Sequence, residues 1–155
     1  MTIQDLGSIG EFVAAIATLV TLIYLATQIR HNTATARAST LQSAVQFTVS
    51  MSESIYRDAE INDLFDRGSA DMASLSDSER SRFHLILIAF FRMSQNSHHQ
   101  FVEGFIDEPT FTGMATSIFA FIDRPGAREW WQANEERFDP GFRTFINKGL
   151  KFDSA

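Results

Sequence analysis

The sequence predicts an all-α protein in which an N-terminal transmembrane helix extends into a compact bundle of about five helices. Three observations support this fold class: an uncharged apolar run near the N-terminus, apolar residues at helical spacing behind capping motifs, and no strand-like alternation or hairpin motif of useful length. The 155 residues are enough for one anchor and one domain. We expect a leader and transmembrane helix over residues 1–30 and a helical domain over residues 31–155.

The apolar run extends from Phe12 to Ala26, fifteen residues without a charge, an amide or a proline. Extended to residues 9–29, it covers roughly 30 Å as a helix, the thickness of a bilayer hydrocarbon core. A buried helix of a soluble core would leave a polar face, and this run has none. A cleaved signal peptide usually has a basic leader, which is lacking here, although residues 34–36 (Ala-Thr-Ala) resemble a cleavage site. An uncleaved membrane helix is the favoured interpretation.

Charges beside the run predict its orientation. No Lys or Arg precedes it, whereas Arg30 and Arg37 follow it, and no acidic residue comes after them until Glu53. Basic residues concentrate on the cytoplasmic side of membrane helices. We therefore expect the N-terminus outside and the C-terminal domain in the cytoplasm, with Arg30 and Arg37 as the juxtamembrane basic residues.

Small residues form a seam along the same run. They follow one another at spacings of three and four: Gly7, Gly10, Ala14, Ala17 and Thr21. Small residues let membrane helices approach closely, so the seam predicts association with a second copy or with another membrane subunit. Such residues are also common in membrane helices, and a register of this kind can arise by chance.

The segment after the run contains neither Pro nor Gly between residues 30 and 56, so the membrane helix could continue without interruption. Its many Ser and Thr residues weaken intrinsic helicity, and a break near Asn32-Thr33 is an alternative. One possible inward-facing row consists of Leu41, Val45, Thr48 and Ser52.

Local motifs predict the helices of the domain. A short helix over about residues 59–67 is expected to end at Gly68, followed by a loop over residues 69–75. Ser76 and Glu79 form an S-x-x-E capping box that opens a central helix reaching about Glu103. Asp107 is expected to cap the next helix.

The last part of the chain predicts two more helices. The first covers residues 127–138 after a turn at Arg124-Pro125-Gly126, and Asp139-Pro140 opens the second. Trp130 and Trp131 point in different directions on one helix, which suggests that at least one is exposed, although partial burial in the bundle is the commoner outcome.

Residues that could perform chemistry are few. Arg92, Asn96, His99 and Glu103 form a polar stripe on the central helix, and His99 and Glu103, four residues apart, are weak candidates for metal ligands. A solvated surface stripe explains the same residues. No nucleophile elbow, phosphate-binding loop or dinucleotide fingerprint is present, and the chain has no cysteine. The sequence predicts no catalytic residue, no cofactor and no enzymatic activity.

The net charge of −6 argues against a nucleic-acid partner. It is unevenly distributed, because residues 1–29 contribute −2, residues 30–52 contribute +2, and the remainder carries −6. The mean hydropathy of −0.08 is therefore an average over an apolar anchor and an acidic domain.

Three stretches resemble uncharacterised small single-pass bacterial membrane proteins, which have an N-terminal membrane helix and a helical cytoplasmic domain. They are LGSIGEFVAAIATLVTLIYLATQIRHNT, SERSRFHLILIAFFRMSQN and GAREWWQANEERFDPGFRTFI. The resemblance implies a location in the bacterial inner membrane and carries over no catalytic residue.

Two functional classes follow. The favoured class is a non-enzymatic, membrane-anchored helical protein that acts as a homo-oligomeric scaffold or as an accessory subunit of a membrane complex. Its partners would be the lipid bilayer and, through the membrane helix, itself or another subunit. The alternative is a membrane-tethered sensor or small-ligand- or metal-binding domain, in which the Phe-rich bundle encloses an apolar molecule or the polar stripe binds a metal.

Overall fold

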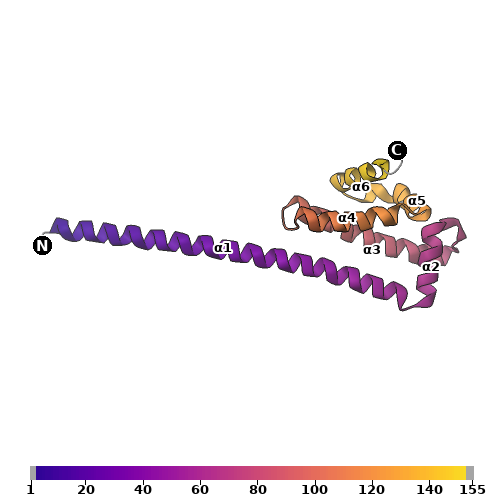
Figure 1. The fold of residues 1–155 in the computed structure, drawn as a ribbon, viewed down its shortest axis with the longest axis horizontal. Coiled ribbons are helices and arrows are strands. Elements are labelled where there is room, and N and C mark those ends of the chain that lie inside the picture. The colour runs from indigo at the N-terminus through magenta and orange to yellow at the C-terminus, as the bar shows by residue number, and fades with distance from the viewer. Residues whose placement is uncertain (1–2, 153–155) are drawn as a thin grey trace. The chain divides into compact units, whose positions relative to one another are not determined.

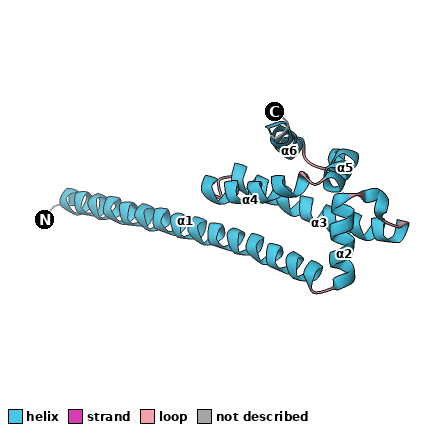
Figure 2. Ribbon diagram, turned by 45° about the vertical axis from the view of Figure 1, so that its right-hand side comes forward, coloured by secondary structure: helices cyan, strands magenta, loops and turns pink. Residues whose placement is uncertain are grey.

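A computed structural model describes the backbone of residues 3–152 and the side chains of residues 10–150, and no strand occurs among them (Figures 1 and 2). The all-α prediction is confirmed. The helices are α1 (Ile3–Tyr56), α2 (Ala59–Ala70), α3 (Asp77–Val102), α4 (Glu108–Ile122), α5 (Pro125–Asn134) and α6 (Pro140–Phe152), with 3-10 turns at Met72–Ser74 and Glu135–Arg137. The chain divides into two compact units, Met1–Ser39 and Thr40–Ala155.

Helix α1 is continuous through Asn32 and Thr33, so the expected alternative of a break there is wrong. The Thr33 hydroxyl donates to the Ile29 carbonyl oxygen at 2.9 Å, and the Thr35 hydroxyl donates to that of His31 at 3.1 Å. These hydroxyls are satisfied inside the helix and do not compete for its backbone N–H groups, as they would in a turn. With no Pro or Gly in this segment, nothing interrupts the helical hydrogen bonds.

The predicted caps are present in the second unit. At the start of α3, the backbone N–H of Ser76 donates to Glu79 Oε2 at 2.8 Å, and the Glu79 N–H donates to Ser76 Oγ at 3.4 Å. The Thr110 N–H donates to Asp107 Oδ1 at 2.9 Å at the start of α4. Asp139 Oδ1 accepts from the Gly141 N–H at 2.8 Å where α6 begins. Each side chain satisfies backbone donors that a helix start leaves unpaired.

Gly68 does not end α2, contrary to expectation, because the helix continues to Ala70. A Cβ on Gly68 would lie 2.9 Å from both Leu75 Cδ1 and Phe83 Cδ2. The glycine is therefore required for close packing of α2 against its neighbours rather than for helix termination.

Helices α2 and α5 approach even more closely at Gly126. A Cβ at this position would lie 2.0 Å from the carbonyl oxygen of Gly68 and 3.0 Å from that of Ser69. Only a residue without a side chain lets the two backbones meet in this way. Gly126 also belongs to α5, since Pro125 is its first residue, so the predicted turn ends earlier than expected.

The five helices from α2 to α6 and their connections together form a core of aromatic and aliphatic side chains. Its buried members are Leu64, Leu75, Phe83, Leu87, Phe91, Ile118, Ile122, Trp130, Trp131, Phe138, Phe142 and Ile146. Trp130 and Trp131 are 1% and 0% exposed, so neither is at the surface.

Both tryptophans can be buried because α5 is covered on more than one side. The Phe91 ring of α3 lies 5.4 Å from the Trp130 ring and 4.8 Å from the Trp131 ring. Trp130 Nε1 donates to His84 Nδ1 at 3.1 Å, and Trp131 Nε1 donates to Asn147 Oδ1 at 2.9 Å. Each indole N–H thus has an acceptor in the interior, which removes the usual penalty for burying it.

Candidate functional site

The first candidate site is the apolar part of α1. This helix is long and apolar enough to cross a membrane, and none of its most apolar 18-residue segment is buried inside the chain. Phe12 and Ile29, near the ends of the apolar run, are 68% and 66% exposed. An apolar surface of this size in water marks a membrane or protein contact. Length and composition of this kind near an N-terminus are also found in signal sequences.

The threonines of this segment are satisfied without outside partners. The hydroxyls of Thr18, Thr21 and Thr27 donate to carbonyl oxygens of their own helix at 2.9, 2.8 and 2.7 Å. An unpaired donor in a hydrocarbon environment would be costly. The segment therefore presents a surface compatible with lipid over its whole circumference.

The predicted association seam lies on α1. Gly10, Ala14, Ala17 and Thr21 are exposed, and no atom lies within 4 Å of a Cβ added to Gly10. The backbone of Gly7 belongs to α1, but its surroundings are outside the described side chains. The seam is thus open to contact with another helix.

The two juxtamembrane arginines are also exposed on α1. Arg30 and Arg37 are seven residues apart, about two helical turns, so they project from nearly the same face of the helix.

The candidate metal ligands His99 and Glu103 are exposed at the C-terminal end of α3. Among the described side chains, no group of three or more His, Asp or Glu residues is placed to hold a metal ion. A metal site would need a further ligand from another part of the domain. Of the acidic residues there, Asp63 pairs with Arg67 at 2.7 Å, and Asp107 caps α4.

The polar stripe on α3 is also divided. Arg92 donates to the Arg137 carbonyl oxygen at 2.9 Å, and its guanidinium carbon lies 4.8 Å from the centre of the Phe138 ring. Arg92 thus connects α3 to the 3-10 turn after α5. These contacts of Arg92 do not involve His99, so the two residues do not form one site.

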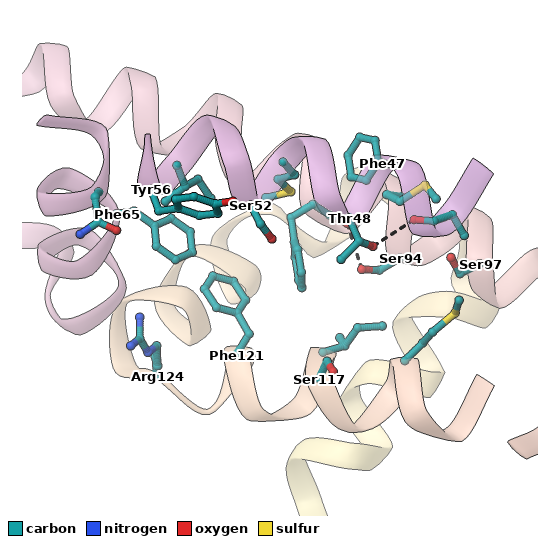
Figure 3. Close-up of a pocket in the computed structure, with 18 of the residues that line it drawn as sticks. Phe47, Thr48, Ser52, Tyr56, Phe65, Ser94, Ser97, Ser117, Phe121 and Arg124 are labelled. Atoms are coloured by element: carbon teal, nitrogen blue, oxygen red, sulfur yellow. Dashed lines mark hydrogen bonds between the residues drawn. The ribbon is translucent and has the colours of Figure 1, made fainter. Parts of the chain in front are cut away.

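The second candidate site is a cavity of about 580 Å³ within the second unit (Figure 3). An apolar ligand site in the bundle was one of the two expectations from the sequence, but its location was not predicted. It lies between residues 44–56 of α1 and helices α2, α3 and α4, and its volume is in the range of small-molecule sites. The largest apolar side chains that line it are Phe47, Met51, Ile55, Phe65, Phe90, Met93, Met114, Ile118 and Phe121.

The face of α1 that lines the cavity differs from the expected inward row. Ala44, Phe47, Met51 and Ile55 line the cavity, and Ala44 is only 5% exposed. Thr48 and Ser52 of the predicted row line the cavity as well, but Leu41 and Val45 do not and are 39% and 52% exposed, so the prediction is wrong for these two residues.

Polar groups are distributed unevenly in the cavity. The hydroxyls of Thr48 and Ser94 donate to the carbonyl oxygens of Ala44 and Phe90 at 3.0 and 2.9 Å, so both are satisfied within their own helices. Figure 3 shows Arg124 near Phe65 at one end and Ser97 at the other. Arg124 makes a 3.5 Å ion pair with the exposed Asp66 at the same end. Charge is therefore concentrated at the α2 end.

His98 is a half-buried histidine outside this cavity. Its Nδ1 atom is buried without a hydrogen-bond partner, and its ring lies 5.0 Å from that of Phe145 and 5.8 Å from that of Phe142. Burial among these rings lowers the pKa of His98, because the charged imidazolium loses hydration there.

Comparisons with known proteins identified no matching protein family, no matching curated protein and no matching solved structure.

Proposed function

We propose that this chain is a non-enzymatic, single-pass membrane protein that works by association, either as a homo-oligomeric scaffold or as an accessory subunit of a membrane complex. The observation that carries the proposal is the apolar segment of α1, which is uncovered by the rest of the chain and has its threonine hydroxyls satisfied internally. Insertion into a bilayer removes this surface from water.

The proposed location is the bacterial inner membrane, with the N-terminus outside and the helical domain in the cytoplasm. Arg30 and Arg37 support this orientation because they share one face just after the apolar segment, where anionic headgroups can contact both. The acidic charge beyond residue 52 limits further attraction of the domain to the membrane.

The natural absence of cysteine makes the orientation testable by single-cysteine labelling. A membrane-impermeant maleimide added to spheroplasts should label Thr2→Cys and should reach the exposed Ala133→Cys only after permeabilisation. Recovery of the protein in the soluble fraction, or labelling of Ala133→Cys before permeabilisation, would contradict anchoring or orientation respectively.

Association is proposed to occur through the small-residue seam. Oxidative cross-linking in membranes should give disulfide dimers for Ala14→Cys and few for the matched variant Leu19→Cys, which lies on another face of α1. Native mass spectrometry from mild detergent then distinguishes the two forms of the proposal. Several copies of this chain would indicate a homo-oligomeric scaffold, and a different bound subunit would indicate an accessory subunit. A monomer that retains no partner and cross-links equally from both positions would refute the function.

The second candidate function is a membrane-tethered domain that binds a small ligand. The cavity beside residues 44–56 favours it, because apolar walls with a few polar groups are typical of ligand sites. No described group of side chains supports the metal-binding form of this alternative.

A further inference from the structure

We propose that the cavity of the second unit binds one long-chain fatty acid, with its carboxylate at Arg124 and its tail between α1, α3 and α4. The inference specifies the ligand of the second candidate function. Supply of the fatty acid from the bilayer rests on the proposed membrane anchoring, whereas the binding site itself does not.

The size of the cavity fits such a ligand. Its volume of about 580 Å³ holds on the order of 20 groups of the size of a water molecule, at roughly 30 Å³ each. A sixteen-carbon fatty acid has about 18 non-hydrogen atoms, so a single chain matches the size of this space. The volume therefore suits a ligand with one tail.

The cavity is also elongated. It is lined by α1 residues from Ala44 to Tyr56, which are separated by about 18 Å along the helix axis. A compact ligand would leave much of this length empty, whereas an extended acyl chain can contact successive turns of α1.

The walls suit a flexible apolar chain. Phe65 and Phe121 stack at 5.4 Å between ring centres, and the Phe90 ring lies 4.8 Å from that of Phe121, which gives a continuous aromatic surface. Met51 and Met93 line the same cavity, and thioether side chains adapt their shape to an irregular ligand. The hydroxyls of Thr48 and Ser94, satisfied by their own helices, require no polar group on the tail.

The polar end suits a carboxylate. Arg124 has five guanidinium N–H donors, and Asp66 engages it through a single 3.5 Å contact. Both side chains are substantially exposed, so their ion pair is weak and leaves donors for a second carboxylate. Asp66 itself disfavours an anion at this end. Its removal should therefore strengthen binding.

The test uses the full chain in lipid nanodiscs with a photoactivatable sixteen-carbon fatty acid that carries a diazirine in its tail. Adduct positions are mapped by peptide mass spectrometry. We expect adducts on residues 47–55, 90–97 and 114–121. Adducts confined to residues 10–29 would support anchoring and overturn the fatty-acid site. If neither region carries adducts, both the fatty-acid site and the membrane anchoring are contradicted. Adducts in the cavity alone would support the fatty-acid site and contradict anchoring.

Variants test the cavity directly. Ser117→Phe places a ring in the cavity, and Thr116→Phe places the same ring on an exposed position of α4 outside it. Ser117→Phe should reduce cavity adducts by roughly tenfold or more, since a pocket that excludes a few methylene groups discriminates to that extent. Thr116→Phe should leave them unchanged. Equal adduct yields with unchanged thermal melting of both variants would overturn the site.

The head group is tested at the charged end. Arg124→Gln should lower labelling by the fatty acid several-fold but not by the corresponding photoactivatable fatty alcohol, and Asp66→Asn should raise labelling by the fatty acid. If neither substitution changes the ratio of acid to alcohol labelling, the assignment of a carboxylate ligand is wrong.

Discussion

The crossing of α2 and α5 makes Gly126→Ala the most informative stability variant. The added Cβ would have to move from 2.0 Å to at least 3.0 Å from the Gly68 carbonyl oxygen, and the obstacle is backbone. Gly68 cannot retreat freely, because its own Cα side is packed against Leu75 and Phe83. Overpacking usually costs about 1–3 kcal/mol, and a rigid obstacle places this variant near the upper end. For a domain of this size the loss corresponds to a melting temperature lower by roughly 12 °C.

The assay follows the two tryptophans, which both lie in α5 within a few residues of the substitution. The tryptophan bands in the near-ultraviolet circular dichroism of the full chain in mild detergent therefore report the bundle and not the apolar part of α1. Gly113→Ala is the matched control, since Gly113 also lies in a helix but no atom lies within 4 Å of the added carbon. This control should melt at the same temperature as the natural chain or higher. If Gly126→Ala and Gly113→Ala have the same melting temperature, the close approach of Gly126 to the Gly68 carbonyl oxygen does not limit packing.

Two further predictions concern pH. Arg67 and Ser76 lower the pKa of Glu79 from 4.5 to about 2, so the folded state resists protonation and the free energy of unfolding should fall as the pH drops from 4.5 towards 2. Glu79→Gln retains the capping box without the titration, and its acid unfolding profile should be flatter; equal slopes would contradict the assigned role of the ion pair. Burial lowers the pKa of His98 below 6.5, although Asp139 opposes the shift, so stability should be constant above pH 6.5 and decrease below it. His98→Leu should remove this decrease in denaturant titrations between pH 7 and 5, and an unchanged decrease would assign it to another group.

Local features of the sequence predicted local structure well. The Ser76–Glu79 box, Asp107 and Asp139 each mark a helix start, because the acceptor and the N–H groups that it caps lie within three residues of each other. The apolar run predicted a membrane-length helix for the same reason, since its evidence is contained in consecutive residues.

Features that depend on distant contacts were not predictable in this way. From the sequence alone, Gly68 is expected to end a helix. In the fold it allows close packing against Phe83 and against Gly126, which lies far along the chain. The burial of both tryptophans requires the Phe91 ring of α3 beside α5 and hydrogen-bond acceptors from α3 and α6. Periodicity along α5 alone carries no information about how many sides are covered.

The location of the cavity was not predicted for a related reason. The predicted inward row of α1 included Thr48 and Ser52, which do line the cavity. It overlooked the larger apolar residues beside them, Phe47, Met51 and Ile55, at spacings of four. That spacing was the available indication of the lining face. The empty space itself arises from how α1 is positioned against α2, α3 and α4, which no single helix specifies.

The contact between α2 and α5 also constrains how the protein is made. Asp66 and Arg124, beside the crossing, are 58 positions apart, so a ribosome adding about 5–20 residues per second needs roughly 3–12 s to supply the second helix after the first. During that interval Leu64 and Phe83 have no α5 to pack against. The nascent bundle thus has a period in which chaperone binding or aggregation competes with folding, and that period ends only when Gly126 and the tryptophans emerge.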